Sequence, residues 1–279
     1  MRNTYPPLNF WQFRQVAREQ WLVQTNKAQS MYVRLFGPLG VNARIRNARV
    51  INTIHRLGLA SGAKALDVGC GHGYALFWLA YRYPQCQFTG LEVDAKLVEH
   101  GRYMAQQLQL SNLSFIHSSA LDIDAEDKYD LIFSMDVLEH IKDDVSTLRN
   151  IRRALRSDGH LALHLPRRHQ ETWTFLSAFR TYTTPDHVRD EYTVLEINDK
   201  LQQTGFEVEY FRYGYSKWGE LAFESNYLFW RSTILRPLTA VILHPLSVWL
   251  AYMDIHQDHA DGNAFIILAR PFNSSGVSV

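Results

Sequence analysis

The sequence predicts an α/β protein with a doubly wound, mostly parallel seven-stranded sheet. Between residues 63 and 165, short apolar segments alternate with stretches of helical periodicity about ten to fifteen residues long. This alternation is typical of a parallel sheet covered by helices on both faces. A glycine-rich turn, Gly69-Cys70-Gly71-His72-Gly73, directly follows the first segment. Hydrophobic residues make up 46% and charged residues 20% of the chain, which is ordinary for a protein with a packed core.

The expected strands follow from the short apolar segments and the glycine and proline residues that bound them. They cover residues 63–68, 87–92, 113–117, 129–135, 159–165, 206–213 and 264–269. We expect helices from the glycine turn to residue 83, and at residues 96–108, 144–155 and 193–204. Residues 8–58 also show helical spacing of apolar positions, interrupted at Gly37-Pro38-Leu39-Gly40.

A length of 279 residues suits one large domain with additions rather than two full domains. We predict an N-terminal helical extension over residues 1–58 and a ligand-binding domain over residues 59–279. Within that domain, residues 167–192 are expected to form a lid. Residues 214–262, rich in apolar and aromatic side chains, are expected to form a helical insertion before the last strand.

The charge and cysteine content limit the partners and the compartment. Lys and Arg total 29 against 28 Asp and Glu, a net charge of +1, which disfavours nucleic acid as the main partner. With two cysteines, Cys70 and Cys86, and no signal-peptide pattern, the expected setting is the cytoplasm. The most apolar stretch, residues 238–253, is shorter than the roughly twenty residues of a membrane span. It predicts a buried helix or pocket wall, with peripheral membrane contact as the alternative.

The glycine turn is expected to bind a ligand at the carboxyl edge of the sheet. Glycines at alternate positions let the backbone turn sharply and approach a ligand closely. They are expected to place backbone N–H groups and a helix N-terminus at the carboxyl edge of the sheet, where open α/β folds bind ligands. The spacing excludes two common nucleotide motifs. Tyr74 and Leu76 stand where a dinucleotide fingerprint requires its last glycine, and no lysine follows for a phosphate loop.

Three segments together resemble one family. Residues 65–73 resemble motif I of class I methyltransferases that use S-adenosylmethionine (SAM), and Glu92 stands where that family ends its second strand with an acid. Residues 130–140, ending in Leu138-Glu139-His140, resemble its fourth-strand motif, and residues 148–166 resemble the following helix and fifth strand. The resemblance covers about residues 45–213 and the last strand. It implies SAM as cofactor and a seven-stranded class I methyltransferase fold.

The resemblance also implies which residues hold SAM. Glu92 is expected to accept hydrogen bonds from the ribose hydroxyls, and Asp67 to contact the methionine end of SAM or to brace the loop. Where the family places an acid near adenine, this chain has Ser119, with Asp122 three residues on. Either side chain, or the backbone at Ala120 alone, is a candidate for the adenine contact. The full expected cofactor set is Asp67, Gly69, Cys70, Gly71, Gly73, Glu92, Val93, Ser119, Ala120, Leu121, Met135, Asp136 and His140.

The candidates for a catalytic base are weaker. His169 follows the fifth strand, His187 and Tyr192 lie in the expected lid, and each is a candidate on position alone. His164, on the fifth strand, reads as a core or pocket residue. We predict no metal site, because the histidines and acids between His256 and Asp261 match no known ligand spacing and read as a polar loop.

We therefore predict a SAM-dependent methyltransferase that acts on a small-molecule acceptor. The apolar insertion slightly favours a lipid-like or polyketide-like acceptor, and O- and C-methylation both stay open. The alternative is a SAM-binding regulatory or scaffolding protein that transfers no methyl group. Nucleic-acid methylation is disfavoured because Ser134-Met135-Asp136-Val137 stands where a base-flipping motif would follow the fourth strand. The oligomeric state is not predicted.

Overall fold

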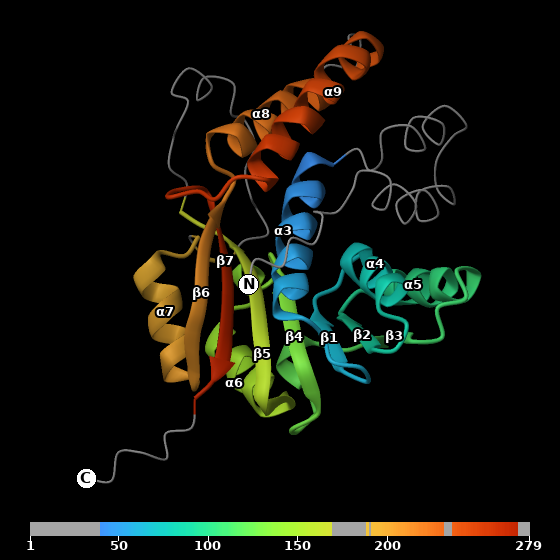
Figure 1. Cartoon of the computed structure of the whole chain (residues 1–279), viewed down its shortest axis with the longest axis vertical. Helices are drawn as coiled ribbons and strands as arrows, with labels where there is room; N and C mark the ends of the chain where they lie inside the picture. The colour runs from blue at the N-terminus through green and yellow to red at the C-terminus, as the bar shows by residue number, and fades with distance from the viewer. Residues whose placement is uncertain (1–39, 169–187, 190, 232–235, 273–279) are drawn as a thin grey trace. The chain divides into compact units, whose positions relative to one another are not determined.

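The computed structural model describes residues 40–168, 188–189, 191–231 and 236–272 (Figure 1). Side chains are described within these ranges except at residues 226–243. The chain divides into two compact units. Among the described residues, the first contains 40–52 and 212–264, and the second contains 53–168, 186–211 and 265–272 where described. Each unit is considered by itself below.

A seven-stranded sheet forms the centre of the second unit, in the order β3-β2-β1-β4-β5-β7-β6. The pairs β1–β2, β1–β4, β2–β3 and β4–β5 are parallel, which confirms the predicted fold class. The strands are β1 (Lys64–Val68), β2 (Gln87–Glu92), β3 (Leu113–His117), β4 (Tyr129–Met135), β5 (Leu155–Pro166), β6 (Phe206–Gly214) and β7 (Ala264–Pro271). Since β1 lies centrally, between β2 and β4, the chain reverses its direction of winding beside β1. This is the place where open α/β sheets bind ligands.

The predicted helices of this unit are present as α4 (Tyr74–Arg82), α5 (Ala95–Gln107), α6 (Asp144–Ala154) and α7 (Val194–Gln203). Side-chain caps set several of their starts. Asp94 Oδ1 accepts from Lys96 N at 2.8 Å at the start of α5. Thr193 and Glu196 form a capping box at the start of α7. Two short 3₁₀ turns, η1 (Ala120–Asp122) and η2 (Leu138–His140), follow β3 and β4 and were not expected from the sequence.

β5 begins four residues earlier than the predicted strand at 159–165. Leu155 pairs with Tyr129 on β4, and the register then shifts before Leu131 pairs with His160. The polar residues 156–158 therefore belong to an irregular start of the strand. The hydrophobic pattern could not show this, because the pairing depends on the neighbouring strand rather than on local periodicity.

The first unit is helical. The N-terminal part of α3 (Val41–Leu57) packs with α8 (Lys217–Arg231) and α9 (Arg236–Ile255). Their shared core contains Val41, Ile45, Ala222, Leu250 and Ala251, each at most 3% exposed. The extension and the insertion were predicted as separate parts, whereas residues 40–52 of the one and 214–262 of the other fall in the same unit. Within the apolar stretch 238–253, Leu250 and Ala251 are buried, whereas Leu246, Trp249 and Tyr252 are 45%, 54% and 55% exposed.

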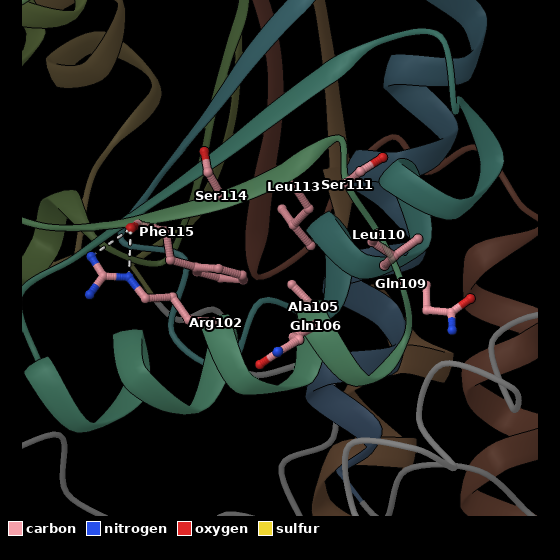
Figure 2. A pocket seen from close by; sticks show the side chains of 9 residues that line it. All are labelled: Arg102, Ala105, Gln106, Gln109, Leu110, Ser111, Leu113, Ser114 and Phe115. Carbon is pink, nitrogen blue, oxygen red and sulfur yellow. Dashed lines mark hydrogen bonds between the residues drawn. The ribbon is translucent and has the colours of Figure 1, made fainter.

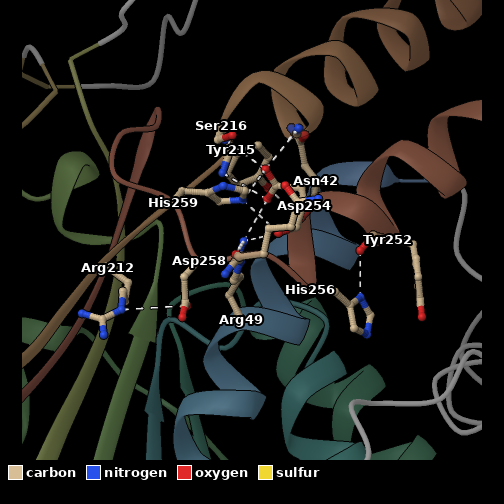
Figure 3. A network of polar contacts seen from close by, with 12 residues as sticks. Asn42, Arg49, Arg212, Tyr215, Ser216, Tyr252, Asp254, His256, Asp258 and His259 are labelled. Atoms are coloured by element: carbon tan, nitrogen blue, oxygen red, sulfur yellow. Dashed lines mark hydrogen bonds and ion pairs between the residues drawn. The ribbon is translucent and has the colours of Figure 1, made fainter.

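A buried carboxylate, Asp254 near the end of α9, joins these helices (Figure 3). Its Oδ1 accepts from the backbone N–H groups of Ser216 at 3.0 Å and Gly219 at 3.1 Å, and its Oδ2 lies 3.3 Å from Arg49 Nη2. His259 Nε2 lies 3.1 Å from the same carboxylate. His259, from the segment read as a polar loop, therefore has a structural partner on α9.

Within the described residues, no helix combines the length and apolar character that crossing a membrane requires. The cytoplasmic location and the peripheral membrane contact stay predictions.

Candidate functional site

The glycine turn takes the conformation that its sequence requires. Gly69, Gly71 and Gly73 have φ values of 72°, 52° and 71°, in the left-handed region that favours glycine. A side chain at Gly69 would also collide with Val137, because an added Cβ would lie 2.5 Å from Val137 Cγ2. The turn between β1 and α4 thus depends on glycine for both its backbone angles and its packing.

The N–H groups of this turn are bonded within the protein. Those of Gly69 and Cys70 donate to Leu91 O at 2.8 and 3.0 Å, and that of Gly73 donates to Cys70 O at 2.8 Å. These three N–H groups therefore already have acceptors within the protein. The turn instead offers close approach of its backbone. This suits a cofactor whose reacting group is a sulfonium cation rather than a phosphate, which would need N–H donors.

Glu92, the last residue of β2, turns its carboxylate toward the glycine turn. Oε2 accepts from Gly71 N at 2.8 Å, and Oε1 accepts from Val93 N at 2.9 Å and Asp94 N at 3.1 Å. The side chain is 9% exposed. Because the ends of β1 and β2 are neighbours in the parallel sheet, one carboxylate bridges the two segments that the sequence analysis paired.

The space beside the turn can take a ligand. A Cβ placed on Gly71 would meet no heavy atom within 4 Å, so the described residues leave this face of the backbone open beside the Glu92 carboxylate. An open backbone face next to a hydrogen-bond acceptor suits an adenosyl group with its ribose hydroxyls. The residues present therefore fit SAM.

Two other residues of the expected set are buried at this edge. Asp67 is 1% exposed at the end of β1, and the two roles predicted for it both stay open. Cys70 is buried, and burial, followed by the charges of Asp67 and Glu92, raises the pKa of its thiol. The thiol therefore stays protonated near neutral pH and is not a nucleophile.

The expected adenine side shows apolar surface and a backbone cap. Val93 is 68% exposed and Leu121 is 42% exposed. Ser119 Oγ accepts from Leu121 N at 3.1 Å and caps η1, where Ala120 is buried. Asp122 is exposed, so the question of what contacts adenine stays open.

A polar pair that the sequence analysis missed lies at the ends of β4 and β5. His164 Nδ1 is 2.6 Å from Asp136 Oδ1, and Asp136, directly after Met135, has φ of 53° although it is not glycine. His164 was read as a core or pocket residue, and it is 2% exposed. The signal for the pair was the position of both residues at the ends of neighbouring strands. His140, also in the expected cofactor set, is exposed in η2.

Tyr192 has a buried structural partner. Its hydroxyl donates to Asp144 Oδ2 at 2.6 Å, and Asp144 also binds Arg189 and Lys200. Burial, with the hydrogen bond to Asp144 as a second cause, raises the pKa of Tyr192. These contacts hold α6 and α7 together and do not favour Tyr192 as a base. Its catalytic role stays a prediction, and His169 and His187 lie outside the described residues.

A cavity of about 580 Å³ lies between α5 and β3 (Figure 2). It is lined by Ala105, Gln106, Leu110 and Ser114 among others. At its rim, Arg102 donates to the carbonyl oxygen of Phe115 through Nε at 3.1 Å and Nη2 at 2.9 Å. None of the expected cofactor residues lines this cavity, so we do not assign it to the site.

The parallel sheet, the left-handed glycine turn and the acid on β2 define the class I fold of SAM-dependent methyltransferases. The model of the methyltransferase domain family matches residues 59–212, more than half of the chain, so the chain belongs to this family. The resemblance drawn from the sequence is confirmed, and SAM is the cofactor of the class.

Curated relatives match over part of their length. The (S)-coclaurine N-methyltransferase of Papaver somniferum is 27% identical over 106 residues, which are 38% of this chain and 30% of that enzyme. The trans-aconitate 2-methyltransferase of Pseudomonas paraeruginosa is 28% identical over 131 residues, 47% of this chain and 46% of that enzyme. The chain therefore spans less than half the length of either relative.

Solved structures share the fold at low identity. Coclaurine N-methyltransferase bound to N-methylheliamine and SAH has a TM-score of 0.56 and 17% identity, covering 80% of this chain and 72% of that one. The [4+2]-cyclase SpnF has a TM-score of 0.59 and 20% identity, covering 80% of each chain. These likenesses show the fold alone.

Proposed function

We propose that this protein binds SAM and transfers its methyl group to a small-molecule acceptor. The observation that carries the proposal is the Glu92 carboxylate turned toward Gly71, 2.8 Å from its N–H, beside an open backbone face. Because the chain belongs to the methyltransferase domain family, the ligand proposed for this geometry is SAM. When bound, SAM supplies an electrophilic methyl group on a positively charged sulfur.

The residues of this chain then have distinct tasks. Glu92 binds the ribose, and the glycine turn lets the adenosyl group approach the backbone of the sheet. Val93 and Leu121 offer exposed apolar surface to the adenine ring. Because SAM is already an activated donor, the protein contributes mainly by aligning the acceptor with the methyl carbon, which is worth several kcal/mol.

The acceptor is proposed to be small and at least partly apolar. Two observations support this reading: the relatives named above act on small molecules, and the region after residue 212 is rich in aromatic side chains. The relatives include both an N-methyltransferase and a methyltransferase of trans-aconitate, so they do not fix the atom that is methylated.

Isothermal titration calorimetry tests the cofactor. We expect SAM and its demethylated product, S-adenosylhomocysteine (SAH), to bind at micromolar strength, and absence of heat at high protein concentration would remove the proposal. Methyl-labelled SAM mixed with fractionated cell extract then tests transfer. Label is expected in the small-molecule or lipid fraction, and label in protein or RNA would contradict the proposed acceptor.

A second candidate is a SAM-binding protein that transfers no methyl group. It is kept because SpnF, which shares this fold, is named for a different reaction. The two candidates differ in one result. Tight SAM binding without label in any fraction of the extract would favour the second.

A further inference from the structure

Asp136 holds an uncommon backbone conformation at the carboxyl end of β4. Its φ of 53° lies in the left-handed region, which aspartate and asparagine tolerate better than other non-glycine residues. Its own N–H donates to the carbonyl oxygen of His164 at 3.0 Å, which ties this conformation to β5. Conformations of this kind persist where the surroundings impose them, and they are concentrated at functional sites.

The side chains of the same two residues are also joined. His164 Nδ1 lies 2.6 Å from Asp136 Oδ1, and the His164 side chain is 2% exposed while that of Asp136 is 27% exposed. Because a carboxylate oxygen accepts, the shared proton lies on Nδ1 and fixes the orientation of the ring. A buried imidazole thus holds a partly exposed carboxylate in place.

The place of this pair in the sheet separates it from the ribose end of the cofactor site. In the order β2-β1-β4-β5, Glu92 ends β2 and the glycine turn follows β1, whereas the pair lies at the ends of β4 and β5. From β2 to β4, which Asp136 follows, is two strand spacings, about 10 Å, and from β2 to β5 is three, about 14 Å. Val137, the next residue after Asp136, packs against Gly69. The pair therefore borders the glycine turn on the side away from Glu92.

We propose that Asp136 contacts the acceptor and takes up its proton, and that His164 is the residue that positions Asp136. The acceptor is accordingly a hydroxyl or amine compound and not a carboxylate. This inference rests on the proposed methyl transfer. It assigns Asp136, which the sequence analysis placed in the cofactor set, to the acceptor instead.

The step balances without any further reactant. A lone pair of the acceptor oxygen or nitrogen forms the new bond to the methyl carbon. The methyl–sulfur bond breaks, and its electron pair stays on the sulfur, which becomes a neutral thioether. The proton of the acceptor passes to the Asp136 carboxylate and from there to solvent. A carboxylate acceptor has no such proton, and its negative charge would be repelled by Asp136.

The test compares three acceptors of similar size: tetrahydroisoquinoline, 2-naphthol and 2-naphthoate, which carry an amine, a hydroxyl and a carboxylate. SAH formation is measured for the wild type and for Asp136→Asn, which keeps the shape of the side chain and suits the left-handed backbone. Asp127→Asn is the matched control, because Asp127 is exposed, has φ of 43°, and lies before β4 at the opposite edge of the sheet. Calorimetry gives the Kd of SAM for each protein.

We expect the wild type to methylate the amine or the naphthol in preference to the naphthoate. Asp136→Asn should lower kcat by about a hundredfold or more, the range for loss of a general base, while the Kd of SAM stays within threefold. Asp127→Asn should match the wild type. Preference for naphthoate, or unchanged kcat in Asp136→Asn, would overturn the proposal. So would a loss of SAM affinity as large as the loss of kcat, because it would return Asp136 to the cofactor site.

The positioning role of His164 is tested by rescue. His164→Leu removes the donor and should lower kcat with little change in KM. In His164→Asn the side-chain amide can take the place of Nδ1, so its kcat should be at least tenfold higher than that of His164→Leu. Equal kcat in the two variants would refute the role. Circular dichroism of both variants reports whether the sheet is intact.

Should the wild type methylate none of the three compounds, binding to the SAH-loaded protein decides. Tighter binding of tetrahydroisoquinoline than of 2-naphthoate, lost in Asp136→Asn, supports the proposal, and the reverse order or equal binding overturns it. Failure of the wild type to bind SAM or SAH at all is a different result, because it removes the proposed function itself.

Discussion

Replacing Glu92 tests the assignment of the cofactor site most directly, because its carboxylate has few acceptor positions and the structure shows how they are used. Three backbone N–H groups donate to it, those of Gly71, Val93 and Asp94. Two of the three are local to the end of β2, and the bond from Gly71 alone among them joins β2 to the glycine turn. A carboxylate accepts about four hydrogen bonds, so roughly one position remains for a ribose hydroxyl.

The expected loss of affinity follows from that count. One hydrogen bond to a charged group is worth about 1.5–3 kcal/mol, which corresponds to roughly tenfold to 150-fold in Kd. Glu92→Gln should therefore weaken SAM binding by at least tenfold. Its amide oxygen can keep the bonds from Val93 and Asp94, while its NH₂ group would face the N–H of Gly71 and can no longer accept from it or from the ribose.

Glu92→Ala should lose a similar factor in SAM affinity and should also unfold more easily, because the N–H of Gly71 loses its acceptor. A cost of about 1–3 kcal/mol is expected, or roughly 2–4 °C in Tm for each kcal/mol. Calorimetry measures the first effect and thermal unfolding followed by circular dichroism measures the second. Glu99→Gln, an exposed change of the same charge on α5, is the control.

The two measurements together can refute the reasoning. A SAM Kd within twofold of the wild type in both Glu92 variants, with a lowered Tm in Glu92→Ala, would mean that the acid only braces the turn. The ribose contact would then have been assigned to the wrong residue, although the fold would stand.

Three further predictions concern the turn, the helical unit and the apolar helix. Gly71→Ala should weaken SAM binding at least tenfold in calorimetry, because it strains a φ of 52° by about 1–2 kcal/mol and puts a methyl group on the open face. The control is Gly62→Ala on the loop before β1, where φ is 84° and the space is also open; this variant should bind SAM normally. Equal losses of SAM affinity in the two variants would point to backbone strain alone. Burial, aided by the charge of Arg44, lowers the pKa of His244 from 6.5 to about 4, so the unfolded state takes up a proton before the folded state does. The contribution of His244 to the free energy of unfolding should thus be constant above pH 6.5 and should fall by about 3 kcal/mol as the pH drops from 6.5 to 4. Urea unfolding should show a smaller loss of stability over this pH range in His244→Gln than in the wild type. An equal loss in both proteins would refute the assignment. Leu246, Trp249 and Tyr252 are 45%, 54% and 55% exposed at three-residue spacing along α9. The protein should therefore pellet with anionic vesicles, and Trp249→Ala should pellet less. Complete recovery of the wild type in the supernatant would refute membrane contact.

The sheet was predictable because its signals are local. Several strands of the second unit are short apolar segments bounded by polar or turn residues, and β2, β3 and β4 begin and end at the predicted residues. The glycine turn was equally readable, since glycines at alternate positions after a strand permit the left-handed angles of a sharp turn that other residues disfavour. The irregular start of β5 was not predictable, because it depends on pairing with Tyr129 rather than on its own sequence.

The grouping of the helices was also beyond the sequence. Val41 on α3 packs in one core with Ala222 on α8 and Leu250 on α9. About 180 residues of chain separate Val41 from Ala222, and about 210 separate it from Leu250. Helical periodicity shows that a face is apolar, but it does not show which other face covers it. The same limit hid the contacts of Asp254, whose partners come from three separate segments.

The two ends of the site differ in the same way, and this difference explains why the cofactor was predictable and the acceptor was not. The cofactor end is built by neighbours in one βαβ unit, the glycine turn and Glu92, whose spacing can be read directly. The acceptor end depends on Asp136 and His164, 28 positions apart, which meet only because β4 and β5 pair in register from Leu131 and His160 onward. Neither residue's place in the sequence shows that the other is its partner. Their pairing gives the acceptor side a fixed negative charge, and that charge is the property by which the class of acceptor can be tested.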